Sequence, residues 1–111
     1  MKLDIKSTNL ELTPAIRDYV EQKMSMVEKY LGSQDVIQCD IELELTTNHH
    51  HKGNIFRAEV NLQLAQELLR VERTEDDLYR AIDKVKDHLA DVINKYKEKR
   101  LARRRESQKG A

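Results

Sequence analysis

The sequence predicts an α+β fold, a two-layer sandwich of order β-α-β-β-β-α in which two helices cover one face of a four-stranded sheet. Two segments, 37–45 and 56–64, alternate strictly between apolar and polar residues, which is typical of strands with one buried face. Two further segments, 14–31 and 75–100, repeat apolar residues at helical spacing. Two such helices can bury the apolar face of one sheet.

The first strand and the first helix are predicted by short local patterns. Residues 2–7 alternate polar and apolar side chains, as in a short half-buried strand. Thr13 and Pro14 are typical of a helix start, because threonine caps the first amide groups and proline suits the first turn. Gly32 is typical of a helix end. A strand, a helix and a strand in this order predict a right-handed crossover between parallel strands.

The central strands are predicted by their alternation. A polar stretch, 48–53, separates the two long strands, and a tight turn near Gln66 precedes a short fourth strand from Leu68 to Arg73. The inward-facing side chains predicted for the long strands are Ile37, Cys39, Ile41, Leu43, Leu45, Phe56, Ala58, Val60, Leu62 and Leu64.

The second helix is predicted to start with Thr74 as its N-cap and Asp77 at the capping-box position. We expect it to end near Arg100. The folded domain should therefore span residues 1–100, and residues 101–111 should form a basic, disordered tail. The apolar stripe of this helix comprises Leu78, Ile82, Val85, Leu89, Val92, Ile93 and Tyr96.

Charge is segregated along a chain whose net charge is zero. Residues 95–111 carry eight Lys or Arg and two Glu, a net charge of +6, so the first 94 residues carry −6. This asymmetry predicts a polyanionic partner for the basic end, with a solubilising tail as the alternative. The outward positions of the sheet are acidic and lack aromatic residues, so RNA should avoid that face. These positions are Asp40, Glu42, Glu44, Glu59 and Glu72.

On a helical wheel of the second helix, one flank of the apolar stripe is basic, while Asp83 and Asp87 occupy the other. We expect the basic flank to contact phosphates; a solvated face is the alternative. Lys23 lies within the apolar stripe of the first helix. Its amine either reaches water or meets a phosphate in the groove between the helices, where Lys95 and Lys99 would converge with it. The basic flank comprises Lys84, His88, Lys95 and Lys99.

No pattern in the sequence predicts catalysis, a metal site or a cofactor. Cys39, the one cysteine, should be an inert thiol in the core, and a single cysteine fits a reducing cytoplasm. Three histidines, 49–51, are consecutive in a loop, where residues rarely converge on one ion. We find no glycine-rich phosphate loop, catalytic triad, membrane span or signal peptide. We therefore expect a cytoplasmic binding protein that is not an enzyme.

Three segments together resemble the ribosome hibernation-promoting and ribosome-associated inhibitor proteins, in their short form. Residues 12–20 (LTPAIRDYV) resemble the first helix of these proteins. Residues 76–83 (DDLYRAID) resemble the signature at the start of their second helix and are the most specific part. Residues 94–99 (NKYKEK) resemble its basic end. The likeness covers roughly residues 1–100.

The resemblance implies a fold similar to double-stranded-RNA-binding domains and binding to rRNA of the small ribosomal subunit, in the decoding channel where mRNA and tRNA would sit. Such a protein would inhibit translation and promote ribosome hibernation under stress or in stationary phase; we expect a monomer when free. The alternative is a protein-interaction module that modulates a transcription factor. Met26, His88 and Asp91 stand where the family is often basic, which would weaken binding.

The predicted rRNA-binding residues come from two sources. The resemblance implies contacts for Arg17, Lys23, Lys86, His88, Lys95, Lys97 and Lys99. The charge pattern adds Lys84, Arg100, Arg103, Arg104 and Arg105.

Overall fold

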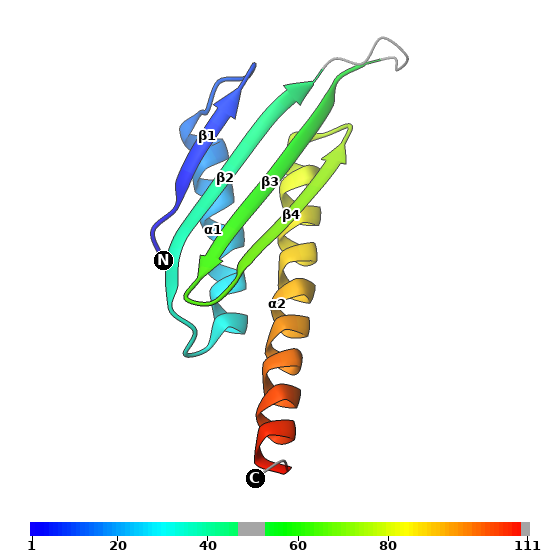
Figure 1. Ribbon diagram of the computed structural model, residues 1–111. Coiled ribbons are helices and arrows are strands. Elements are labelled where there is room, and N and C mark those ends of the chain that lie inside the picture. Colours follow the sequence, from blue (N-terminus) through cyan, green and yellow to red (C-terminus); the bar gives the residue numbers. More distant parts are fainter. Residues whose placement is uncertain (47–52, 110–111) are drawn as a thin grey trace.

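The computed structural model, which describes residues 1–46 and 53–109, contains one four-stranded sheet (Figure 1). Its strands are β1 (Asp4–Thr8), β2 (Val36–Thr46), β3 (Ile55–Leu64) and β4 (Leu68–Glu75), in the spatial order β1-β2-β3-β4. β1 pairs with β2 in parallel, and the other neighbours are antiparallel. The predicted element order and the parallel first pair are therefore confirmed.

Two helices, α1 (Pro14–Leu31) and α2 (Leu78–Lys109), lie side by side on one face of this sheet (Figure 1). α1 begins as predicted: the Thr13 side chain accepts a hydrogen bond from the Ile16 amide at 3.2 Å. It ends at Gly32, whose φ of 59° is a backbone conformation that glycine adopts at little cost. α2 packs on β3 and β4 and against α1. The other face of the sheet remains open to solvent.

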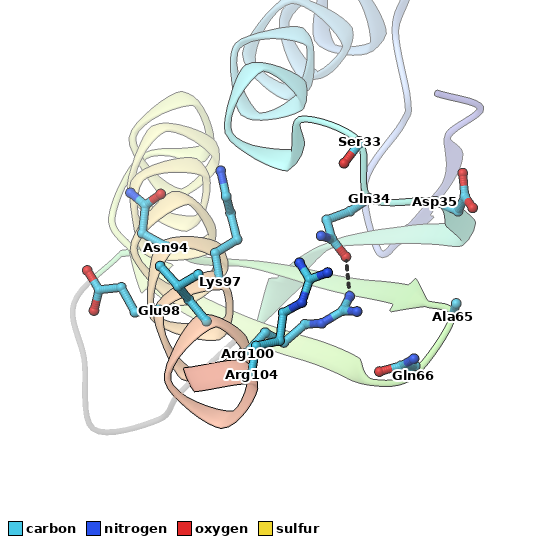
Figure 2. Close-up of a pocket in the computed structure, with 11 residues that line it drawn as sticks. Ser33, Gln34, Asp35, Ala65, Gln66, Asn94, Lys97, Glu98, Arg100 and Arg104 are labelled. Atoms are coloured by element: carbon cyan, nitrogen blue, oxygen red, sulfur yellow. Dashed lines mark hydrogen bonds between the residues drawn. The ribbon is translucent and has the colours of Figure 1, made fainter. Parts of the chain in front are cut away.

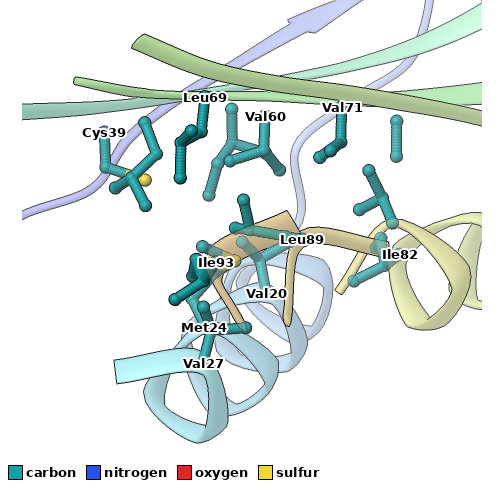
Figure 3. Packing of buried hydrophobic residues seen from close by; sticks show 14 of the residues in the cluster. Val20, Met24, Val27, Cys39, Val60, Leu69, Val71, Ile82, Leu89 and Ile93 are labelled. Carbon is teal, nitrogen blue, oxygen red and sulfur yellow. The ribbon is translucent and has the colours of Figure 1, made fainter. Parts of the chain in front are cut away.

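The core lies between the helices and the sheet (Figure 3). Cys39 is fully buried in it, which confirms the inward position predicted for its thiol. Burial raises the pKa of this thiol from 9.0 to about 12, so it stays protonated at neutral pH. The labelled side chains that meet in Figure 3 are Val20, Met24 and Val27 of α1, Ile82, Leu89 and Ile93 of α2, and Cys39, Val60, Leu69 and Val71 of the sheet.

The start of β2 departs from the predicted alternation. Ile37 was expected to face the core, but it is 64% exposed. The pairing register with β3 shifts between Val36 and Gln38, and Val36 packs against the core instead. An extra residue at such an irregularity reverses the direction of the side chains before it. The prediction for Ile37 is therefore wrong, whereas Cys39, Ile41 and Leu43 are buried as expected.

Both predicted ends of α2 are wrong. Thr74, expected to cap the helix, belongs to β4, where it pairs with Arg57. The helix starts three residues later than expected, and the Asp77 carboxylate accepts a hydrogen bond from the Arg80 amide at 2.9 Å. At the other end, the helix does not stop near Arg100 but continues to Lys109, beyond the edge of the sheet (Figure 1).

Replacing Asp77 by alanine should therefore lower the free energy of unfolding by about 1 kcal/mol, because the side chain that caps α2 is lost. Replacing Thr74 by alanine is the matched control and should change it by less than half as much. Urea unfolding followed by circular dichroism measures both values. Equal losses for the two variants would contradict the assignment of the cap to Asp77.

Candidate nucleic-acid interface

The open face of the sheet carries a cluster of acids around one arginine. Arg57 on β3 lies 2.9 Å from Glu44, 2.6 Å from Glu59 and 3.7 Å from Glu72, and it also pairs with Glu42. Its side chain is only 17% exposed. The acids were predicted on this face from the sequence, but Arg57 was not, although its place between inward-facing Phe56 and Ala58 puts it on the same face. The carboxylates of this cluster outnumber its arginines, and the resulting net negative charge disfavours an RNA phosphate here.

The groove between α1 and α2 is closed by a second polar cluster. Tyr19 donates its hydroxyl to Asp83 Oδ2 at 2.8 Å, and Lys23 Nζ lies 3.1 Å from Asp83 Oδ1. Lys23 also lies 5.1 Å from the centre of the Tyr19 ring, over its face. Tyr79 meets that ring edge-on at 4.8 Å. Lys23 is therefore tied to a carboxylate of the other helix.

This cluster shifts the titration of both acidic groups. Burial, together with the hydrogen bond to Asp83, raises the pKa of Tyr19 from 10.0 to about 12. Burial alone would raise the pKa of the Asp83 carboxyl, but the hydrogen bonds from Tyr19 and Lys23 lower it overall. The arrangement favours a neutral phenol, a carboxylate and an ammonium group. It is a structural bridge between the helices at neutral pH.

Changing Tyr19 to phenylalanine should therefore cost about 1 kcal/mol of stability at pH 7, through the lost hydrogen bond. Because the folded pKa of the phenol is raised, its stabilising effect is fully present below pH 10 and is lost as the pH rises towards 12. The difference in free energy of unfolding between wild type and variant should thus disappear at alkaline pH. Urea unfolding at pH 7, 9 and 11 measures it, with Tyr79→Phe as the control. A gap that does not change with pH contradicts the bridge.

Two further lysines of the groove are also engaged. Lys86 Nζ lies 2.9 Å from the Asp87 carboxylate, and the Lys86 side chain is only 15% exposed. Lys97 donates to the backbone carbonyl of Tyr30 at 2.8 Å, near the end of α1, where a cation is favoured by the helix dipole. Lys97 thereby links α2 to α1, whereas the Lys86–Asp87 pair lies within α2. Both ammonium groups already have partners within the protein.

The basic flank of α2 faces away from α1. Lys84, Lys95 and Lys99 are exposed, and none has a carboxylate partner within residues 1–46 and 53–109. α1 packs instead against the flank that carries Asp83 and Asp87. The expectation that Lys23 converges with Lys95 and Lys99 in one groove is therefore wrong, because they lie on opposite sides of α2. The wheel located both flanks of α2 but could not tell which one α1 covers.

The remaining predicted residues are spread over four places. Arg17 is exposed on the flank of α1 that also carries Glu28, three turns later, and Glu28 pairs with the amino terminus of Met1 at 3.0 Å. His88 is half-buried, and its Nδ1 has no hydrogen-bond partner in the described part of the chain. Arg100 is half-buried near the end of the domain. The exposed arginines of the α2 extension are Arg103, Arg104 and Arg105.

We define the outer basic flank as Lys84, Lys95, Lys99 and Arg103–Arg105, all of which are exposed. These lysines and arginines have no carboxylate partner among the described residues, so their charges are free to bind an external anion. Exposed, unpaired Lys and Arg along one element are the usual footprint of nucleic-acid binding.

Within the described residues, no three His, Cys, Asp or Glu side chains are grouped so as to hold a metal ion. The three histidines at 49–51 lie outside the described residues. None of the described helices combines the length and apolar character needed to cross a membrane.

Comparisons with known proteins agree on one family. The family model for "Sigma 54 modulation protein / S30EA ribosomal protein" matches residues 3–101. The chain is 35% identical over 97 residues to a ribosome hibernation promotion factor of Lactococcus lactis, and 32% identical over 97 residues to that of Staphylococcus aureus. Each match covers 87% of this chain, but only 50% and 48% of those proteins. The chain thus spans about half the length of these curated relatives.

Solved structures share the fold. The N-terminal domain of Thermus thermophilus Protein Y superposes with a TM-score of 0.72 at 33% identity, over 86% of this chain and 99% of that domain. A ribosomal subunit interface protein from Coxiella burnetii gives a TM-score of 0.73 at 18% identity, over 88% and 99% of the two chains, which is a likeness of fold alone. The extent of the family match, from residue 3 to residue 101, decides the assignment: the chain belongs to the Sigma 54 modulation protein / S30EA ribosomal protein family.

Proposed function

We propose that this protein binds the small ribosomal subunit in the decoding channel and promotes ribosome hibernation by excluding mRNA and tRNA. The observation that carries the proposal is the outer basic flank of α2, which presents exposed cations along one helix and its extension. The relatives from Lactococcus lactis and Staphylococcus aureus, named as ribosome hibernation promotion factors, support this choice of partner. The protein would act in the cytoplasm, as a monomer when free.

The proposed mechanism is occupancy, and it requires no chemical step. Lys84, Lys95 and Lys99, with Arg103–Arg105, bind rRNA phosphates and release the cations condensed on them. His88 contributes at the margin of this contact, and Arg17, which lies on α1, makes a separate contact. Lys23 and Lys97 contribute indirectly, because they fix α1 against α2, whereas Lys86 is paired with Asp87 within α2. The bound domain then fills space that mRNA and tRNA need.

The proposal is tested by cosedimentation with purified small subunits at several salt concentrations. Neutralising about six phosphates predicts that log affinity falls with log salt at a slope of about −4 to −5. Excess mRNA with tRNA should displace the protein. Binding that does not change with salt would remove the electrostatic mechanism. Failure to sediment with ribosomes, together with capture of a transcription factor, would favour the alternative of a transcription-factor modulator.

A further inference from the structure

The face of α2 that packs on the sheet changes from apolar to basic where the sheet ends. Leu89, Ile93 and Tyr96 on this face are buried. The next side chains on it are Arg100, which is half-buried, and Arg104, which is exposed. These two arginines are one turn apart, about 6 Å along the helix axis. The end of the core is therefore marked by two neighbouring guanidinium groups.

Both arginines line an open cleft at this end of the domain (Figure 2). Across from α2, the cleft is bounded by the α1–β2 loop at Ser33–Asp35 and by the β3–β4 turn at Ala65 and Gln66. Its volume is about 830 Å³, which lies within the range of small-ligand sites. A space of this size accepts a nucleotide of a single strand but not a double helix.

Arg100 is held in position for binding an anion. Its guanidinium group donates to the Gln34 side chain at 2.8 Å (Figure 2) and to the Tyr96 hydroxyl at 3.4 Å, and it lies 5.8 Å from the centre of the Tyr96 ring. All these hydrogen bonds use one nitrogen. The other two nitrogens have no partner among the residues that the structure describes, so one edge of the planar group is free to bind a phosphate.

The other lining residues suit a nucleobase and a ribose. Ser33, Gln66 and Asn94 offer neutral donors and acceptors, and Leu101, 49% exposed, offers an apolar surface. Single-stranded RNA is recognised through such contacts to base edges and base planes. The carboxylates Asp35 and Glu98 also line the cleft; they would repel phosphates, but they can accept hydrogen bonds from base amino groups and from the ribose 2′-hydroxyl. This mixture favours a nucleotide over an acidic peptide.

We propose that this cleft binds one nucleotide of single-stranded RNA, with its flanking phosphates on Arg100 and Arg104 and its base against the loop and the turn. The inference rests on the proposed function, because it assumes that the partner is RNA. It adds a second contact, which shares only Arg104 with the outer basic flank and is selective for unpaired strands.

The test uses fluorescein-labelled octauridine and fluorescence anisotropy with the full chain. Arg100→Gln with Arg104→Gln should weaken binding at least tenfold, since two charged hydrogen-bond donors are lost. On the opposite wall, Ala65→Lys should tighten binding and Ala65→Glu should weaken it, so that their affinities differ about tenfold. Matched controls are Gln22→Lys and Gln22→Glu on the exposed face of α1, which should differ less than twofold. An RNA duplex of the same length should not respond to the Ala65 changes.

A second readout is the set of backbone amide shifts on titration with octauridine. Shifts at Ser33, Gln34 and Gln66 support the cleft, whereas shifts confined to α2 overturn it. Equal affinity of Ala65→Lys and Ala65→Glu for octauridine also overturns the proposal. So does a glutamate octapeptide whose binding changes in the same way with the Ala65 substitutions. If the wild-type protein sediments with ribosomes but octauridine does not bind in the cleft, only this inference fails. If octauridine binds the cleft but ribosomes are not bound, only the proposed function fails.

Discussion

Replacing Arg57 by methionine is expected to lower the free energy of unfolding by about 3 kcal/mol at pH 7. The arginine side chain is 17% exposed and has four carboxylate neighbours, of which Glu59 is the most buried, at 14% exposure. Methionine keeps the aliphatic packing but leaves these carboxylates close together without a cation. Breaking a largely buried ion pair in this way costs several kcal/mol. The expected value is at the low end because Glu42 and Glu72 partly reach water.

The loss should depend on pH in a defined direction. A hydrogen bond from Asn61 lowers the pKa of the Glu59 carboxyl from 4.5; burial opposes this, and Arg57 lowers it further. A depressed pKa contributes stability that is present above the unfolded value and is lost as the pH falls through the folded one. The deficit of Arg57→Met should therefore be largest at neutral pH and shrink below about pH 4.

The measurement is urea unfolding at pH 7 and at a pH below 4, with Arg70→Met as the control. Arg70 also contacts Glu59, at 3.2 Å, but its side chain is 68% exposed, so its removal should cost less than 1 kcal/mol. If Arg57→Met and Arg70→Met lower the free energy of unfolding equally, Arg57 is not the centre of the cluster. A deficit for Arg57→Met that grows in acid would contradict the charge argument.

Reversing the charges of Lys95 and Lys99 is expected to weaken binding to the small ribosomal subunit at least 100-fold at moderate salt. Both side chains are exposed on the outer basic flank, so the fold should be unaffected. Each change removes one phosphate contact and places a carboxylate beside the RNA. The slope of log affinity against log salt should become less steep by about two. Cosedimentation with small subunits measures both quantities.

Two variants calibrate this result. Lys2→Glu with Lys6→Glu changes the net charge equally on exposed positions in and before β1, away from α2, and should weaken binding less than threefold. Lys86→Met with Lys97→Met removes groove cations that already have protein partners; it should lower stability and leave affinity nearly unchanged. If the groove variant lost affinity while remaining folded, the RNA contact would lie between the helices and not on the outer flank.

Much of the fold could be predicted because it depends on local patterns. Alternation located β2 and β3, and Thr13 with Pro14 located the start of α1. The errors occurred where pairing between segments decides the outcome. Ile37 is turned outward by a register shift that depends on β3, and Thr74 is held in β4 by its pairing with Arg57.

The candidate site was only partly predictable, for a related reason. The helical wheel located the basic residues of α2 correctly, since angular position follows from sequence alone. It could not show that Lys23 meets Asp83 or that Lys97 reaches Tyr30, because these contacts depend on which flank of α2 packs against α1. The twelve predicted residues therefore include some whose cations already have partners within the protein and others that remain available, and only the packing separates them.

The segregated charge of the molecule also has a consequence for the speed of association. The end of α2 projects beyond the sheet and concentrates positive charge, while the body of the domain carries the compensating negative charge. Such a molecule has a large electric dipole moment. In the field of a polyanion it experiences a torque that turns the helix tip forward before any contact forms. Productive encounters then become more frequent than random tumbling allows, and this gain disappears as salt shortens the Debye length.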